Sequence, residues 1–211
     1  MKMNITLSIL LRKANLHIHK DILQLITNYF HKIDKICLIL AICPNFKIKK
    51  LVKDKLFNKA AKNGSLSILQ WLMDNNFPYD SLVFSHAASN GSLMNMKWLL
   101  INNFPYNTWV FAYTAMNGSL TNLQWLLEND FPYDSLVFEY AALYGSLDNL
   151  QWLLENDFPY DSSVFSNAAD NGSLTNMKWL LINNFPYESS VFSNAAKHGS
   201  LDNLQWLLKN D

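Results

Sequence analysis

One pattern recurs every 27 residues from residue 54 onward, and it constrains the fold more than any other feature. "GSLDNLQWLL", which begins at Gly145, returns as "GSLTNMKWLL" at Gly172. All six glycines keep this spacing, and a tryptophan follows each of them by seven residues. A fixed period of roughly 20 to 50 residues is the signature of stacked repeats. The sequence therefore predicts a repeat domain over residues 54–211, with units 54–80, 81–107, 108–134, 135–161, 162–188 and a shorter 189–211.

Each unit is expected to form two short helices. In residues 162–188, the pairs Val-Phe and Ala-Ala are four residues apart and share one helical face. Gly172 is expected to end that helix in the left-handed conformation, and Ser173 to cap a second helix with an apolar stripe. Pro186 then favours an extended linker. No unit has a strand pattern, so we predict an all-α solenoid of αα-hairpins.

Several recurring side chains are interpreted as packing elements. We expect the tryptophan of each unit to pack between adjacent hairpins, and the Phe-Pro-Tyr that closes five units to form a stacked linker. One place of the second helix is asparagine in five units, at positions 95, 122, 149, 176 and 203. We expect these amides to hydrogen-bond from repeat to repeat.

The net charge is zero, because 17 basic and 17 acidic side chains balance. A neutral chain lacks the basic footprint of nucleic-acid-binding domains, so the composition predicts no nucleic-acid partner. No apolar run approaches the roughly 18 to 20 residues that span a bilayer, and the N-terminus has no signal-peptide pattern. We therefore expect an intracellular, cytoplasmic protein that contacts no membrane.

Motifs of catalysis and metal binding are missing from the sequence. It contains no nucleophile elbow, phosphate loop or carboxylate pair outside the repeats. Cys37 and Cys43 lie in an apolar run and are interpreted as reduced core thiols. Together with His17, His19 and His31 they lack the close pairing that zinc sites use. We predict no enzyme activity, no metal and no cofactor.

The segment "FSNAADNGSLTNMKWLLIN" (residues 165–183) resembles the ankyrin repeat. The resemblance rests on Ala168-Ala169, on Gly172-Ser173-Leu174 and on Trp179-Leu180-Leu181, and it recurs in all six units. Ankyrin units have about 33 residues and a projecting β-hairpin. The shorter period resembles the ankyrin-like repeats of large DNA viruses and protists. The resemblance implies a non-enzymatic, protein-binding solenoid, located in the host cytoplasm if the chain is viral.

Comparison of the units with one another separates constant from variable positions. Counted from the first residue of each unit, such as Ser81, the second, fifth, sixth and ninth places vary, and they lie on the side of the first helix opposite the Val-Phe and Ala-Ala face. In the middle units they become aromatic or large and apolar, which is typical of interface hot spots. Tyr144 is added through the resemblance, because ankyrin repeats contact partners after Ala-Ala. The candidate partner-binding residues are Leu82, His86, Trp109, Tyr113, Met116, Leu136, Tyr140, Leu143 and Tyr144. Alternatively, these side chains only pack on one another.

Residues 1–53 do not follow the repeat, and two interpretations stay open. They form an N-terminal helical cap that covers the apolar face of the first unit, as solenoids require. Alternatively they resemble an F-box, with Leu16, Ile26 and Tyr29 among the matching apolar positions but without its Leu-Pro opening. The chain is then a scaffold for an unknown protein partner, or a substrate adaptor that docks on the adaptor subunit of a cullin-type ubiquitin ligase.

The last unit keeps the apolar pattern of the internal units. Leu204 and Leu208 are apolar, whereas the outer face of a terminal capping helix is polar. An uncovered apolar edge favours contact with another surface. This pattern predicts weak self-association through the C-terminal repeat.

Overall fold

The structure, a computed structural model, describes residues 55–144, 146–198 and 200–210. The chain divides into two compact units between Tyr79 and Asp80. The described part of the first unit contains α5 (Leu56–Lys62) and α6 (Leu66–Asp74). The second unit contains α7 (Leu82–Asn90), α8 (Leu93–Ile101), α9 (Trp109–Asn117), α10 (Leu120–Glu128), α11 (Leu136–Tyr144), α12 (Leu147–Glu155), α13 (Ser163–Asp170), α14 (Leu174–Ile182), α15 (Ser190–His198) and α16 (Leu201–Asn210).

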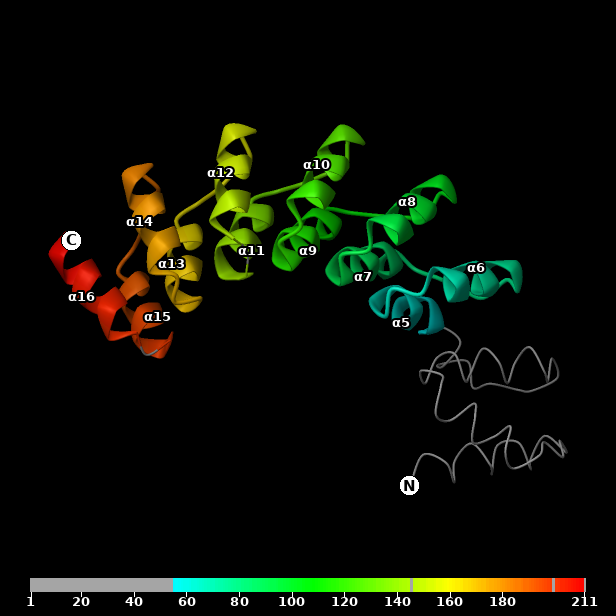
Figure 1. Ribbon diagram of the computed structural model, residues 1–211, viewed down its shortest axis with the longest axis horizontal. Helices are drawn as coiled ribbons and strands as arrows, with labels where there is room; N and C mark the ends of the chain where they lie inside the picture. Colours follow the sequence, from blue (N-terminus) through cyan, green and yellow to red (C-terminus); the bar gives the residue numbers. More distant parts are fainter. Residues whose placement is uncertain (1–54, 145, 199, 211) are drawn as a thin grey trace, which may run out of the picture. The chain divides into compact units, whose positions relative to one another are not determined.

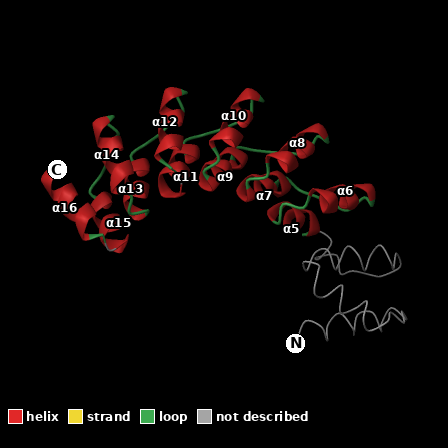
Figure 2. Cartoon of the chain, in the orientation of Figure 1, coloured by secondary structure: helices red, strands yellow, loops and turns green. Residues whose placement is uncertain are grey.

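The described residues form only helices, turns and loops (Figure 2). The twelve helices are arranged as hairpins, so the prediction of an all-α helical-repeat solenoid is confirmed. No strand occurs in the described ranges, and a projecting β-hairpin is therefore missing from them.

Local chemistry sets the ends of the helices. Gly91 and Gly118 follow α7 and α9 with φ of 78° and 80°, a left-handed conformation that costs glycine nothing. At the start of α10, the Ser119 hydroxyl oxygen accepts a hydrogen bond from the backbone N–H of Asn122 at 3.4 Å. These signals appear in the sequence, and they place the turn between the two helices of each hairpin.

The linker between hairpins begins with a left-handed Asn or Asp. Asn103, for example, has φ 56°, and its N–H bonds to the carbonyl of Leu100 at 3.0 Å. The next N–H, that of Phe104, bonds to the carbonyl of Leu99 at 3.0 Å. This is the Schellman pattern that ends many helices. It turns the chain so that Phe104 enters the stack and is only 2% exposed.

The first helices of the second unit pack directly on one another. The contacts run from α7 to α9, from α9 to α11, from α11 to α13 and from α13 to α15. Each second helix packs mainly on the first helix of its own hairpin, and Figure 1 shows first and second helices in separate rows. The row of first helices therefore presents side chains from successive repeats next to each other.

The core consists of the Val-Phe and Ala-Ala faces together with the linker phenylalanines. Val110, Phe111 and Ala115 have no exposed surface, and Phe131 is 2% exposed. The six tryptophans of the repeat are only half-buried, unlike these core residues. Trp125 packs its indole against Phe131 of its own unit, with ring centroids 5.6 Å apart. Phenylalanine, more than tryptophan, therefore fills the space between repeats.

The recurring asparagines of the second helices are buried. Asn122 is 3% exposed, and its Nδ2 donates to the backbone carbonyl of Gly91 at 3.0 Å. The bond joins neighbouring repeats, but its acceptor is a backbone oxygen and not another amide. Asn149 has no exposed surface, and neither of its side-chain polar atoms has a partner among the described residues. The repeat-to-repeat bond is therefore present at Asn122 and missing at Asn149.

Residues 1–53, to which the cap and F-box interpretations apply, lie outside the described residues. The histidines and cysteines considered as metal ligands lie there too. Within the described ranges, no cluster of three or more metal-ligating side chains occurs. No helix in the same ranges has the length and apolar character needed to cross a membrane.

Candidate binding face

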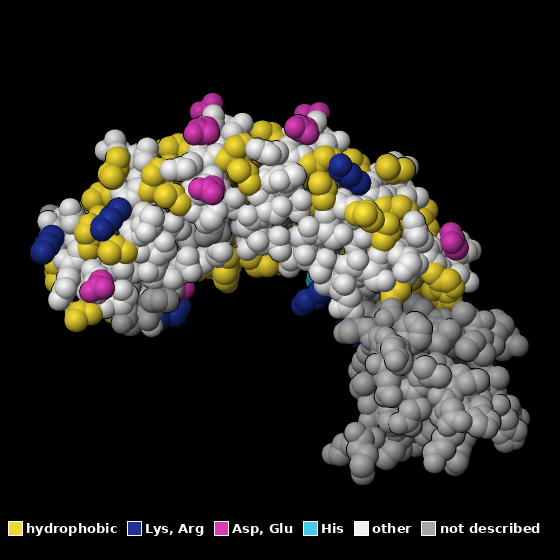
Figure 3. All heavy atoms as spheres, in the orientation of Figure 1, with side chains coloured by type: hydrophobic (Ala, Val, Ile, Leu, Met, Phe, Trp, Pro, Cys, Tyr) yellow, Lys and Arg dark blue, Asp and Glu magenta, His cyan; other side chains and the backbone are white. Residues whose placement is uncertain are grey.

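The candidate residues lie on the side of α7, α9 and α11 that faces away from the core. Leu82 is 47% exposed, Trp109 38% and Tyr144 57%. The remaining candidates are half-buried, and these are His86, Tyr113, Met116, Leu136, Tyr140 and Leu143. We call the side formed by all nine residues the variable face. On the side of the molecule drawn in Figure 3, apolar atoms are visible along the edge below α9 and α11.

Four aromatic residues of this face contact one another, and we call Trp109, Tyr113, Tyr140 and Tyr144 the aromatic cluster. Trp109 and Tyr113 are one turn apart on α9, with ring centroids at 5.7 Å. Tyr140 on α11 meets Trp109 edge-on at 6.1 Å and Tyr113 at 6.0 Å. Tyr144 extends the cluster from Tyr140 at 6.1 Å. Packing of α9 on α11 thus brings together residues that are 27 or more positions apart.

The five other candidates lie on α7, α9 and α11, the helices of the variable face. Leu82 and His86 belong to α7, Met116 to α9, and Leu136 and Leu143 to α11. Of the nine candidates, the ring contacts join only the four aromatic residues of α9 and α11. Both interpretations of the sequence apply to the result, because the rings pack on one another and still expose Trp109 and Tyr144.

The surroundings of Tyr140, in the middle of the cluster, favour the neutral form of its hydroxyl group. Burial raises the pKa of the Tyr140 hydroxyl, and the neighbouring Tyr113, Tyr144 and Glu139 raise it further. A neutral phenol can donate one hydrogen bond and accept others. Tyr140 therefore offers a ring face and a hydroxyl group without charge.

Sequence reasoning missed Glu139, which lies beside the cluster on α11. Burial raises the pKa of its carboxyl group, the charge of Asp161 adds to this, and hydrogen bonds from Ser163 and Asn167 act against it. Its signal was in the sequence, because Glu139 is the only charged residue at the fifth place of any of the six repeat units. It links α11 to α13 at the edge of the variable face.

Beyond α11 the same side of the first helices is polar and linked from repeat to repeat. Asn194 Nδ2 donates to the carbonyl of Ser166 at 3.1 Å. Lys197 Nζ lies 2.9 Å from Asp170 Oδ1. Lys197 is the only Lys or Arg on α7, α9, α11, α13 and α15. The row of first helices therefore has no basic stripe.

No protein-family model matches the sequence, and no curated protein matches it. Two solved structures are similar to it in fold. One is the pentatricopeptide repeat protein PPR10 in complex with an 18-nt psaJ RNA element, and the other is a variant of that protein with three cysteine-to-serine changes, in complex with an RNA element of the same description. For each the TM-score is 0.52 and the identity 9%, over 85% of this chain and 31% of that chain. The chain thus spans less than a third of the length of the proteins it matches.

This likeness corrects the ankyrin interpretation. The fold resembles pentatricopeptide repeats, and the expectation of an ankyrin-like family is wrong. Ala-Ala, Gly-Ser-Leu and Trp-Leu-Leu describe how two helices pack around a glycine turn, a requirement common to αα-hairpin repeats. The feature particular to ankyrin repeats is the projecting hairpin, which the described residues lack.

The partner expectation is corrected as well. The repeat pattern and its variable positions predicted a protein partner, and the zero net charge predicted that nucleic acid is excluded. That exclusion is wrong, because the similar structures contain RNA. The net charge of a protein reflects only how strongly it attracts the phosphates of a nucleic acid. Proteins that bind single-stranded nucleic acid combine a positively charged groove with aromatic side chains on which the bases stack, and net charge does not register the stacking part.

Proposed function

We propose that this chain is a non-enzymatic helical-repeat scaffold that binds single-stranded RNA along the variable face. The aromatic cluster is the observation that carries the proposal. Its rings belong to adjacent repeats, and Trp109 and Tyr144 retain 38% and 57% of their surface exposed. Base stacking on such side chains is worth about 1–3 kcal/mol per base. The fold likeness to RNA-bound repeat proteins supports this class of ligand.

From residue 81 onward, the sixth place of each repeat contributes one side chain. In order, these residues are His86, Tyr113, Tyr140, Asn167 and Asn194. Each has a ring face or an amide that can stack on a base or hydrogen-bond to its edge. In helical-repeat RNA readers, successive bases are contacted by successive repeats. We infer that RNA lies across the first helices, with its bases over α9 and α11.

Electrostatics predict an unusual salt dependence for this binding. Each neutralised phosphate of a single strand contributes about −0.7 to the slope of log K against log salt. The only lysine on the first helices of the second unit is Lys197, and Asp170 lies beside it. Binding is therefore expected to depend on stacking, with a slope shallower than about −2.

Fluorescence anisotropy with labelled single-stranded RNA of mixed sequence tests the proposal. Trp109→Ala and Tyr140→Ala are each expected to weaken binding by about 5- to 100-fold, the loss of one stacked base. Ile101→Ala, which removes a 78% exposed apolar residue from α8, serves as the control and is expected to leave the affinity unchanged. Wild-type protein that binds no RNA at low salt contradicts the proposal.

An apolar protein segment is the second candidate ligand of the same face. Its support is the lack of basic side chains there, together with the Trp, Tyr and Met content typical of interface hot spots. This candidate is favoured over RNA if the chain binds no RNA but retains a defined protein from a nuclease-treated extract. That protein should be lost with Trp109→Ala and retained with Ile101→Ala.

A further inference from the structure

The zero net charge conceals a strong separation of charge along the chain. Residues 1–62 contain 13 of the 17 basic side chains and 3 of the 17 acidic ones, whereas residues 63–211 contain 4 basic and 14 acidic side chains. Such an asymmetry within one chain is typical of proteins with a polyanionic partner. Of the 13 basic residues, the structure describes Lys55, Lys59 and Lys62.

These three lysines share one side of α5, and we call them the lysine face. Lys55 immediately precedes the helix, and Lys59 and Lys62 follow it by four and seven residues. All three are exposed, and neighbours at this spacing have Cβ atoms about 5–6 Å apart. Their ammonium groups can therefore contact successive phosphates of one strand. The opposite side of α5 is buried through Leu56, Phe57, Ala60 and Ala61.

The lysines occupy variable places of their repeat unit. Counted from Asp54, they stand at the second, sixth and ninth places, where α9 has Trp109, Tyr113 and Met116. In the later units, Lys197 is the only lysine at any of these places. A lysine there is therefore no requirement of the hairpin fold, and its occurrence three times in one unit needs another explanation.

The lysine face does not stabilise α5 by itself. Lys55 lies at the N-terminus of the helix, where the helix dipole disfavours a cation, and the first turn has no acidic residue. Lys55 and Lys59 are four residues apart, a spacing at which like charges repel. Among the described residues, neither of these two lysines has an ion-pair partner. A bound anion would relieve both unfavourable effects.

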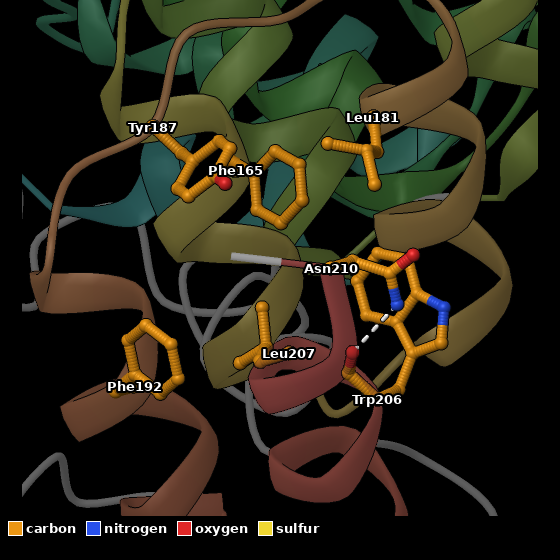
Figure 4. A pocket seen from close by; sticks show the side chains of 7 residues that line it. All are labelled: Phe165, Leu181, Tyr187, Phe192, Trp206, Leu207 and Asn210. Atoms are coloured by element: carbon orange, nitrogen blue, oxygen red, sulfur yellow. Dashed lines mark hydrogen bonds between the residues drawn. The ribbon is translucent and has the colours of Figure 1, made fainter.

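The second unit has no comparable cluster of cations. Its basic residues are Lys97, Lys178, Lys197 and Lys209, and they belong to four different helices, α8, α14, α15 and α16. The pocket between the last two hairpins is lined by uncharged side chains alone (Figure 4). Within the described ranges, α5 is thus the helix that offers several positive charges on one side.

We propose that the lysine face binds phosphate groups of the RNA backbone. This inference rests on the proposed function, to which it adds a contact that carries no sequence information. Two ammonium groups that each neutralise a phosphate give a slope of about −1.4 for log K against log salt, within the shallow slope expected above. A membrane surface suits α5 less, because its apolar side is buried and cannot insert between lipids.

The test uses the full chain and a labelled abasic oligomer, which keeps the phosphodiester backbone of a single strand but has no bases to stack. Fluorescence anisotropy at about 50 mM salt should detect binding. Lys55→Gln, Lys59→Gln and Lys62→Gln combined should weaken it about tenfold or more. No binding of the oligomer by the wild type overturns the proposal, and binding to phosphatidylserine vesicles instead would assign α5 to a membrane surface.

Matched variants separate position from charge. Lys97→Gln, Lys178→Gln and Lys209→Gln combined remove three charges from exposed places of second helices and should leave the affinity for the oligomer unchanged. Arginine at the three lysine-face positions keeps the charge and should keep the binding, which guards against unfolding of the glutamine variant. Equal losses in the two glutamine variants, or a loss in the arginine variant, overturn the proposal.

The aromatic cluster distinguishes failure of this inference from failure of the proposed function. Trp109→Ala combined with Tyr140→Ala should weaken binding of RNA and leave binding of the abasic oligomer unchanged. In the glutamine variant of the lysine face, the salt slope for RNA should become shallower by about 1.4. RNA binding that requires Trp109 but has the same slope in both proteins overturns the lysine face alone. Lysine-dependent binding of the oligomer, with RNA binding insensitive to the aromatic substitutions, supports the lysine face and contradicts stacking.

Discussion

Phe131 stacks on Tyr106 with ring centroids 4.3 Å apart, although the two residues close successive repeats. Phe131 also meets Phe84 of α7 at 5.2 Å and Trp125 of its own hairpin at 5.6 Å. The linker phenylalanine therefore contacts two hairpins at once. Stacked short hairpins depend on such contacts, because helices of this length are marginal when isolated.

Replacement of this phenylalanine is expected to cost more than replacement of the repeated tryptophan. Phe131→Ala removes a ring that is 2% exposed and should lower the free energy of unfolding by about 3–5 kcal/mol. Trp125→Ala removes a half-buried ring and should cost about 2 kcal/mol. Denaturant melts measure both. A larger loss in Trp125→Ala contradicts the assignment of the core to phenylalanine.

The fold was predictable where the chain's own chemistry decides it. Gly118 at a left-handed turn and Ser119 at a helix start are local signals, and both act as expected. The burial of Phe131 was less accessible, because it depends on the left-handed Asp130 that turns the linker into the stack. Trp125 is half-buried because Phe131 occupies the space between hairpins. The periodicity of the sequence does not show which of the two rings takes that space.

The placement of the candidate residues on one side of α7, α9 and α11 was predictable from the sequence, whereas their contacts were not. Variation among repeats identified Trp109 and Tyr140, and adjacency of α9 and α11 brings them together at 6.1 Å. Glu139 was missed because its burial depends on α13, which belongs to the next hairpin. Nucleic acid was wrongly excluded because net charge does not register the stacking of bases on aromatic side chains.

Two buried asparagines at equivalent places are expected to differ in their contribution to stability. Asn122→Ala removes the bond to the Gly91 carbonyl and leaves that oxygen without its partner, which should cost about 1–3 kcal/mol. Asn149→Ala removes an amide without a partner in the described residues and should cost less than about 1 kcal/mol. Thermal and urea unfolding compare them. Equal losses would show that the Gly91 bond contributes nothing.

Glu139→Gln is expected to stabilise the protein at neutral pH. The folded-state pKa of Glu139 is raised above the ordinary 4.5, so folding favours the protonated carboxyl group. Its stabilising contribution is present below pH 4.5 and is lost as the pH rises through the raised value. Glutamine stays neutral, and the gain at pH 7 should be a few tenths of a kcal/mol, because the site is partly exposed.

The comparison of Glu139→Gln with wild type at pH 4 and pH 7 supplies the decisive contrast. The two proteins should differ in stability at pH 7 and converge at pH 4. Glu128→Gln, on the exposed side of α10, is the control for removal of one charge. A variant that is less stable than wild type at pH 7 would show that the carboxylate is needed by Ser163 and Asn167.

Two glycines with the same backbone conformation differ in the space around them. Gly91 and Gly118 both have φ near +80°, so alanine at either position should cost about 1–2 kcal/mol. At Gly91 the added carbon would also lie 2.5 Å from Asn117 Oδ1, whereas at Gly118 the nearest atom is 3.9 Å away. Gly91→Ala should therefore be the more destabilising change. The reverse order in denaturant melts would contradict the described packing of Asn117.

The binding of RNA along the variable face is tested most directly by photo-crosslinking of single-stranded RNA that carries 4-thiouridine, with the crosslinked peptides identified by mass spectrometry. Our account predicts crosslinks in α9 and α11, at Trp109, Tyr113, Tyr140 or Tyr144, and their loss in Trp109→Ala combined with Tyr140→Ala. It predicts none on the second helices α8, α10 and α12. Crosslinks confined to the second helices, or a pattern unchanged by the double substitution, would contradict it.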